Sequence, residues 1–162
     1  MTLVEQAKAL QTEARHLFSH LDFPAAFPWQ PVLIGSALSG LMVDRDLDVM
    51  FDAPDANTPT ILHGLTTLSR QVDLRTADFR DERADRRPTP AITDERFYVV
   101  LHTPTWKIDL TFWLHITDRP HVPDALRLRN ASDEQRLRIL QLKTNTADRD
   151  SSAIYRDVLG DR

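Results

Sequence analysis

Hydrophobic residues near the start of the chain recur at the three- and four-residue spacing of an amphipathic helix. The spacing predicts a helix from Leu3 to Leu21 with Thr2 as its N-cap. His16 and His20 lie one turn apart on it, but the Glu of a zinc-binding HExxH is absent, so we expect a solvated or half-buried face. The next segment holds three prolines and is expected to be an extended loop that aromatic side chains fold onto the core: Phe23, Phe27 and Trp29.

Short apolar or alternating segments later in the chain predict strands. The first, Val32–Ile34, ends at a small-residue turn, and a brief helical stretch separates it from a second strand that ends near Asp52. Arg96–Thr103 and Trp106–Leu114 are rich in β-branched and aromatic residues and flank a short proline-containing turn, which indicates an antiparallel hairpin. Val72–Phe79 is expected to form a further strand.

Three more helices follow from spacing and capping signals. One runs from about Pro59 to Gln71 behind Asn57 or Thr58, and another from Ser132 to Asn145, with Glu134 or Gln135 near the capping-box position. The last runs from Ser152 to Leu159 and ends at Gly160. The chain between Asp118 and Ser132 is polar and has no element assigned to it.

The segment Asp81–Glu95 is rich in charge and broken by proline, which predicts a loop or mobile flap. Arginines in and beside it could meet a phosphate, although a charge run is more often simply solvated: Arg80, Arg83, Arg86 and Arg87. Lys107, Lys143 and Tyr155 could also contact a phosphate or a base, and we expect solvated lysines and a packing tyrosine instead.

Composition bounds the class of protein. A length of 162 residues predicts one domain over 1–162, with its core at about 32–114 and C-terminal helices at about 132–160. The net charge of −4 argues against a protein built mainly to grip duplex nucleic acid. The absence of cysteine rules out thiolate chemistry and fits a cytoplasmic protein. We expect neither a signal peptide nor a membrane span, because no apolar run is long enough.

Carboxylates interrupt two of the predicted strands. Asp46 and Asp48 are two residues apart, so their side chains project from one face, and Asp109 is the lone carboxylate at the centre of the strand 106–114. Neighbouring carboxylates repel, and a hard divalent cation such as Mg²⁺ resolves the conflict. Three carboxylates on one sheet face fit a two-metal site for in-line displacement. Asp44 shares the strand face, but the flanking apolar pattern favours Asp46 and Asp48.

Gly35 and Ser36 stand where the first strand gives way to the brief helical stretch. Two of the four glycines in the chain, Gly35 and Gly40, fall within six residues, which marks a tight turn. Backbone N–H groups at the start of such a turn form an anion site, and the Ser36 hydroxyl can donate one more hydrogen bond to a phosphate. Together with the carboxylates, this turn suits nucleotidyl transfer.

At these residues the chain resembles the nucleotidyltransferase superfamily typified by DNA polymerase beta, in particular its small stand-alone members. The shared pattern is an apolar strand, Gly35-Ser36, nine residues, the pair Asp46-x-Asp48, and Asp109 on a later strand. The resemblance spans about residues 32–114. It implies transfer of a nucleoside monophosphate from an NTP, with Mg²⁺ or Mn²⁺ held by the three aspartates and Asp109 also serving as general base. In two places the chain differs from many small relatives, with Ala37 in place of an arginine and Arg45 in place of a serine.

We therefore expect an α+β fold, a small mixed β-sheet flanked by helices, that is nucleotidyltransferase-like. The expected function is metal-dependent transfer to a hydroxyl acceptor, with a small molecule, a protein or an RNA end all open. An antibiotic-modifying enzyme and an antitoxin-type protein modifier both fit. The alternative is a non-catalytic relative that binds a partner protein or a nucleotide, against which the three retained acids argue.

Overall fold

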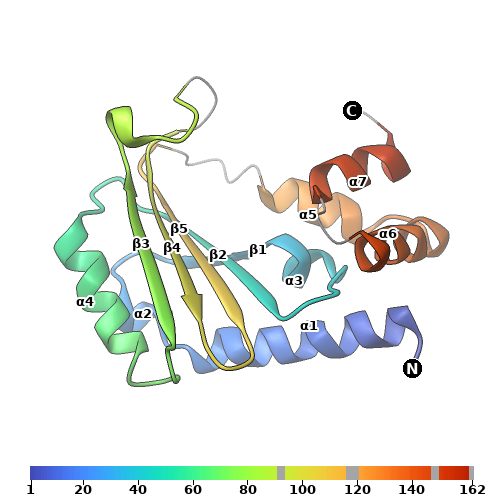
Figure 1. The fold of residues 1–162 in the computed structure, drawn as a ribbon, viewed down its shortest axis with the longest axis horizontal. Helices are drawn as coiled ribbons and strands as arrows, with labels where there is room; N and C mark the ends of the chain where they lie inside the picture. Colours follow the sequence, from blue (N-terminus) through green and yellow to red (C-terminus); the bar gives the residue numbers. More distant parts are fainter. Residues whose placement is uncertain (91–93, 116–120, 147–149, 161–162) are drawn as a thin grey trace.

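Five strands form one mixed sheet in the order β1-β2-β5-β4-β3, with helices around it (Figure 1). This computed structural model describes residues 1–90, 94–115, 121–146 and 150–160. The strands are Pro31–Ile34 (β1), Asp46–Asp52 (β2), Thr76–Glu82 (β3), Arg96–His102 (β4) and Lys107–Trp113 (β5). The helices are Leu3–His20 (α1), Phe23–Ala26 (α2), Gly35–Ser39 (α3), Thr58–Leu68 (α4), the 3₁₀ turn Ala84–Arg86 (η1), His121–Arg129 (α5), Asp133–Asn145 (α6) and Ser151–Leu159 (α7). The predicted α+β fold with a small mixed sheet is confirmed.

Strand pairing decides which side chains meet. The strands β2 and β5 pair in parallel, whereas β1–β2, β4–β5 and β3–β4 pair antiparallel. The antiparallel hairpin of β4 and β5 is therefore confirmed. In this register Asp48 lies opposite Ile34 on one side and opposite Asp109 on the other.

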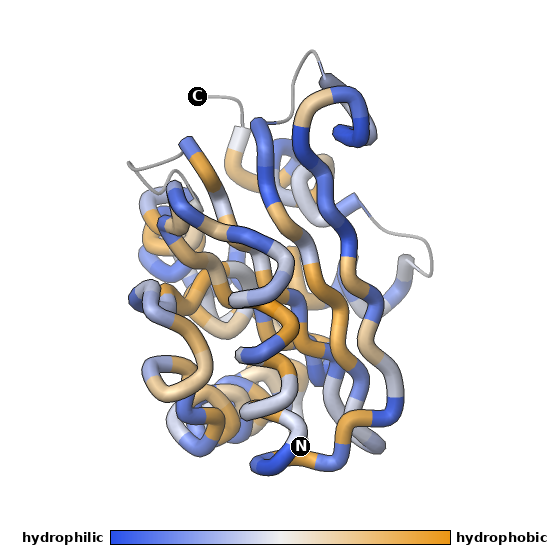
Figure 2. The backbone as a smooth tube through the Cα atoms, turned by 90° about the vertical axis from the view of Figure 1, so that its left-hand side faces the viewer, coloured by the Kyte–Doolittle hydropathy of each residue, from blue (hydrophilic) through white to orange (hydrophobic). Residues whose placement is uncertain are grey.

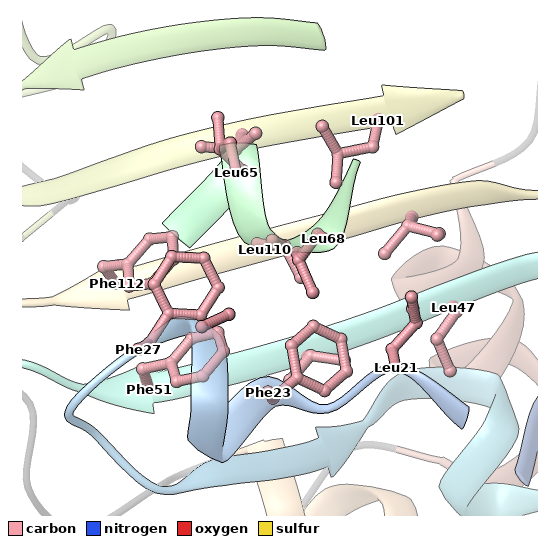
Figure 3. Close-up of a cluster of buried hydrophobic side chains, with 14 of the residues drawn as sticks. Leu21, Phe23, Phe27, Leu47, Phe51, Leu65, Leu68, Leu101, Leu110 and Phe112 are labelled. Atoms are coloured by element: carbon pink, nitrogen blue, oxygen red, sulfur yellow. The ribbon is translucent and has the colours of Figure 1, made fainter. Parts of the chain in front are cut away.

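One face of the sheet packs against α1, α2 and α4 and forms the main core. Phe51 and Phe112 stack with ring centroids 4.6 Å apart, and Phe27 meets Phe112 edge-on at 4.9 Å (Figure 3). The inward residues of the three central strands are buried: Leu47, Val49, Phe51, Phe97, Val99, Leu101, Ile108, Leu110 and Phe112. Because side chains alternate along a strand, the polar residues between them emerge on the opposite face.

A second apolar cluster joins the C-terminal helices to the N-terminal half of α1. Its buried members come from α1, α5, α6 and the segment after α3: Ala7, Leu41, Leu128, Ile139 and Leu140. In Figure 1, α5, α6 and α7 gather beside α3 and the start of α1, away from β3. The C-terminal helices thereby stand next to the residues that follow β1.

Hydropathy follows the same division. Hydrophobic residues occupy the middle of the strands, and hydrophilic residues collect towards their ends (Figure 2). Within the described ranges, no helix combines the length and apolar character needed to cross a bilayer.

Capping predictions are confirmed at both ends of the chain. Thr2 and Glu5 form a capping box at the start of α1, and Ser132 and Gln135 form another at the start of α6. Asn57, one of the two candidates, caps α4 through the Thr60 N–H.

Two segments differ from the prediction because local capping and strand position outweigh periodicity. The expected extended loop after α1 contains α2, since Asp22 accepts from the Ala25 N–H and Pro24 sits in the first turn, where its missing donor costs nothing. The predicted strand 72–79 is wrong in its bounds, because β3 begins only at Thr76. As an edge strand with exposed polar residues it carries little alternating apolar signal.

The polar stretch before Ser132 contains a helix that the sequence pattern missed. Among the described side chains of α5, from Val122 onward, only Ala125 and Leu128 are buried, at 3% and 7% exposure, so its apolar stripe is too short to stand out. Residues 116–120, the first part of that stretch, lie outside the described residues.

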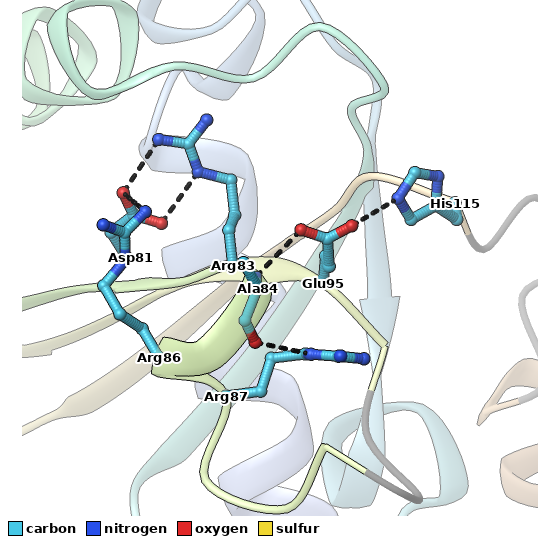
Figure 4. Close-up of polar contacts among 7 residues, drawn as sticks. All are labelled: Asp81, Arg83, Ala84, Arg86, Arg87, Glu95 and His115. Carbon is cyan, nitrogen blue, oxygen red and sulfur yellow. Dashed lines mark hydrogen bonds and ion pairs between the residues drawn. The ribbon is translucent and has the colours of Figure 1, made fainter.

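Arginines around the end of β3 are bound to carboxylates and backbone (Figure 4). Arg83 and Arg86 both pair with Asp81, at 2.8 and 3.0 Å, and Arg80 pairs with Asp78 at 2.8 Å. The Arg87 Nε donates to the Ala84 carbonyl at 2.9 Å. The expected loop 81–95 is also shorter than predicted, because its first two residues complete β3, and residues 91–93 lie outside the described part.

Candidate functional site

Three carboxylates converge on the sheet face opposite the main core. The parallel pairing of β2 and β5 puts Asp48 beside Asp109, and Asp46 projects from the same side of β2. One ligand oxygen from each lies within 4.8 Å of the others, and no other such group of three occurs among the described residues. We call these three residues the carboxylate cluster.

A lysine and a tyrosine contact the carboxylate cluster from β5 and β4. The Lys107 ammonium lies 3.0 Å from Asp109 Oδ2 and 3.7 Å from Asp46 Oδ2. The Tyr98 hydroxyl donates to the same Asp109 oxygen at 2.9 Å. The other oxygens, Asp46 Oδ1 and Asp109 Oδ1, are buried and have no hydrogen-bond partner in the described part of the chain.

Burial and mutual repulsion shift the protonation of the cluster. Burial, together with the charges of Asp46 and Asp109, raises the pKa of Asp48 to about 7. Burial also raises the pKa of Asp46, against the opposing charge of Lys107. The pKa of Lys107 is raised, because attraction to Asp46 and Asp109 outweighs the opposing effect of burial. The ionised carboxylates therefore repel one another, and a further cation would reduce this repulsion.

The two buried oxygens without a hydrogen-bond partner, here called the orphaned oxygens, indicate that the cluster suits a metal ion. A buried carboxylate oxygen without a donor is costly unless a cation or water satisfies it. Two such atoms belong to residues of the carboxylate cluster, and carboxylate oxygens are the ligands that Mg²⁺ and Mn²⁺ prefer. The residues present fit a hard divalent cation.

Gly35 lies directly against the carboxylate cluster. Its φ is +67°, and a Cβ built there would collide with the Asp48 carboxylate, because Ile34 and Asp48 are paired across β1 and β2. Gly40, with φ +80°, ends the same short helix. The tight turn predicted from these two glycines is present, and it is pressed onto a cluster member.

A cavity of about 250 Å³ lies beside Gly35 and Ser36, and residues of α6 and α7 form part of its wall. Its lining comprises Gly35, Ser36, Val43, Asp44, Asp46, Asp48, Lys143, Ser151 and Tyr155. Lys143 is only 4% exposed, and its ammonium donates to the Leu41 carbonyl at 2.7 Å and to the Tyr155 hydroxyl at 3.4 Å. The expectation of a solvated lysine was wrong at Lys143, whereas the Lys107 side chain is 41% exposed and also pairs with Asp46 and Asp109.

The spacing of residues along α6 contains a signal for the buried lysine. Lys143 follows Ile139 and Leu140 at four and three residues on α6, so it shares their inward face. Ser151, the first residue of α7, carried no comparable signal. It reaches the cavity only through the packing of α7 on α6.

Other candidate residues lie outside the carboxylate cluster. Asp44 lines the cavity but does not join the group of three. Arg45 pairs with Glu13 of α1 at 2.9 Å, and Ala37 is buried at 1% exposure. His20 contacts the Gln71 carbonyl at 3.2 Å on an exposed surface, as expected for a solvated face.

A larger groove of about 630 Å³ lies between α1 and α6. It is lined mainly by apolar surface, and it contains no member of the carboxylate cluster. By size alone this groove would be the better candidate for a ligand site. A catalytic site, however, requires polar groups that converge, and these lie beside Gly35.

The raised pKa of Asp48 predicts a pH-dependent stability of the metal-free protein. Between about pH 4 and pH 7 the folded protein keeps a proton that the unfolded chain has lost, so stability falls as pH rises through this window. The full loss is roughly 4 kcal/mol for a carboxyl moved from 3.8 to about 7. We expect a much smaller decline in Asp48→Asn, in which only the raised pKa of Asp46 contributes, and thermal melts in EDTA across that range measure it.

Saturating Mg²⁺ should restore the melting temperature of the wild-type protein at the upper end of the range and leave that of Asp48→Asn nearly unchanged. Parallel pH profiles for the two proteins would show that Asp48 is not the strained group.

The five-stranded mixed sheet with its flanking helices is similar to a nucleotidyltransferase fold. No protein-family model matches the chain, and no curated protein matches it in sequence. Among solved structures it is similar to the Cid1 poly(U) polymerase with Mg and 3′-dATP bound, with a TM-score of 0.54 and 20% sequence identity. The match covers 82% of this chain and 41% of that one, so the chain spans about two fifths of that protein's length. At this identity the likeness shows the fold alone.

Proposed function

We propose that the protein is a metal-dependent nucleotidyltransferase that moves a nucleoside monophosphate from an NTP to a hydroxyl acceptor. The observation that carries the proposal is the carboxylate cluster itself. Three acids with two orphaned buried oxygens lie beside the Gly35–Ser36 turn on a nucleotidyltransferase-like fold. The similar solved structure holds Mg and 3′-dATP, which supports this class of ligand.

Asp46, Asp48 and Asp109 would hold Mg²⁺ or Mn²⁺. When bound, the ion would neutralise the phosphate charge and stabilise the attacking and leaving oxygens of an in-line displacement. The cavity supplies the triphosphate site: Ser36 offers a hydroxyl, and the Lys143 ammonium lies in the same wall. These groups are positive or hydrogen-donating, as an anionic ligand requires.

The transfer joins the acceptor oxygen to the α-phosphorus and breaks the bond to the β-phosphate oxygen, so pyrophosphate leaves. The acceptor hydroxyl loses a proton in the process, and we assign Asp109 to receive it. Its Oδ2 is held by Tyr98 and Lys107, whereas its Oδ1 is without a donor among the described residues. Tyr98 and Lys107 thereby fix the rotation of the carboxylate.

The non-catalytic alternative has one observation in its favour. Lys107 partly neutralises the cluster, so three acids can coexist here at less cost than the sequence suggested. A protein of this kind would bind a nucleotide or a partner protein without turnover.

One experiment separates the two functions. The protein is incubated with Mg²⁺ and each NTP labelled at the α-phosphate, with RNA ends, hydroxyl-bearing small molecules or cell extract as acceptors. We expect label on an acceptor with the wild-type protein and none with Asp48→Asn. Calorimetry with Mg²⁺ and each NTP runs in parallel. Binding without transfer would favour the non-catalytic function, and the absence of both would end the catalytic proposal.

A further inference from the structure

Lys107 places a positive charge directly beside the carboxylate cluster. It is the first residue of β5, two positions before Asp109 and opposite Asp46 across the parallel pair. Its ammonium lies 3.0 Å from Asp109 Oδ2 and 3.7 Å from Asp46 Oδ2. The side chain is 41% exposed, so it approaches the two acids from the solvent side.

Lys107 makes the two oxygens of Asp46 and of Asp109 unequal, because it contacts only one oxygen of each carboxylate. Asp109 Oδ2 accepts from both Lys107 and Tyr98, and Asp46 Oδ2 faces the same ammonium. The Oδ1 atoms of both acids are buried and lack a donor among the described residues. In Asp46 and Asp109, one oxygen thus faces an internal cation, which leaves their Oδ1 atoms, together with the Asp48 carboxylate, for a metal.

Charge balance then limits how many metal ions the free protein can hold. With all three carboxylates ionised, as metal ligands are, their −3 and the +1 of the ammonium sum to −2. One divalent ion cancels this charge. A second would leave an excess of two positive charges in a partly buried site, which is unfavourable until phosphate supplies negative charge.

We propose that Lys107 is an internal counter-cation that restricts the nucleotide-free protein to one divalent ion, so that the second binds only together with the phosphates of the nucleotide. The inference rests on the proposed function in one respect: the carboxylate cluster must bind divalent ions. It makes Lys107 a positioning residue that acts through Asp46 and Asp109 and touches no reacting atom.

Counting bound Mn²⁺ tests the proposal without any measurement of turnover. Free Mn²⁺ is followed by electron paramagnetic resonance during titration of the wild-type protein, Lys107→Met and Lys107→Arg, with and without a non-hydrolysable NTP analogue. Methionine keeps the length of the side chain and removes its charge, whereas arginine keeps the charge. Lys8→Met, on the exposed side of α1, controls for the loss of one surface charge. Circular dichroism melts establish that each variant is folded.

We expect one ion for the wild-type protein, Lys107→Arg and Lys8→Met without nucleotide, and two for all three with it. Lys107→Met should take up the second ion without nucleotide, at least about tenfold more tightly than the wild-type protein does. Equal stoichiometry and affinity in the wild-type protein and Lys107→Met would overturn the inference and leave the proposed function intact. Two ions in the nucleotide-free wild-type protein would overturn it as well. No binding to any of the proteins would instead refute the metal site, and the inference with it.

Discussion

Replacing Asp46 by asparagine is expected to lower the rate of nucleotidyl transfer by about a thousandfold or more. The variant keeps the size of the side chain but loses the charge that faces Lys107 and the orphaned Oδ1. Since the acid is strained by burial and by Asp109, its removal should not weaken the fold. Initial rates with labelled NTP and thermal melts measure the two effects.

Asp44→Asn is the matched control for this variant. Asp44 lies two residues earlier and lines the same cavity, but it stands outside the carboxylate cluster. Transfer by this variant should stay within a few-fold of the wild-type rate. An equal loss in both variants would mean that the cavity needs negative charge in general, and not a metal ligand at position 46.

Gly35→Ala should abolish most activity although it alters no chemical group of the site. The positive φ costs about 1–2 kcal/mol for alanine, and the new methyl group collides with the Asp48 carboxylate. A displaced carboxylate in a preorganised site costs about a hundredfold in rate. Activity, together with Mn²⁺ affinity, shows whether the damage reaches the cluster.

Gly40→Ala separates backbone strain from the collision. Its φ of +80° is equally unfavourable for alanine, but the nearest atoms are the ends of the flexible Arg136 and Gln11 side chains, at 3.1 and 3.3 Å. We expect a similar loss of stability with a much smaller loss of activity. If the two variants lose activity alike, strain in the turn would explain the effect, and contact with Asp48 would not.

The carboxylate cluster could be predicted from the sequence because each acid sits on a strand whose alternate residues are strongly apolar. Because side chains alternate along a strand, the apolar residues define the face that packs on the core. Asp46, Asp48 and Asp109 must then project from the opposite face. The parallel pairing that joins Asp48 to Asp109 is a contact across some sixty residues. No local pattern encodes this pairing; Asp109 was expected near the other two acids because it is the lone carboxylate on an apolar strand, and the resemblance implied the same.

The error at Lys143 concerns a residue whose environment is set by a segment distant in the sequence. Lys143 can be buried because the Leu41 carbonyl and the Tyr155 hydroxyl accept hydrogen bonds from its ammonium. A lysine without such partners would be solvated, which is what composition predicts. The edge strand β3 was misplaced for the converse reason, since it has only one neighbour and little burial to pattern it.

The charge pattern of β3 has a consequence for how the protein behaves in a crowded solution. An edge strand offers unpaired backbone groups that can recruit a strand from another molecule, the first step towards aggregation. Along β3 and at its end, arginine and aspartate side chains pair with one another: Arg80 with Asp78 within the strand, and Arg83, just after it, with Asp81. An incoming strand would have to bury these charges, which is unfavourable. The charged residues that give β3 little apolar alternation therefore also protect the β3 edge of the sheet from self-association.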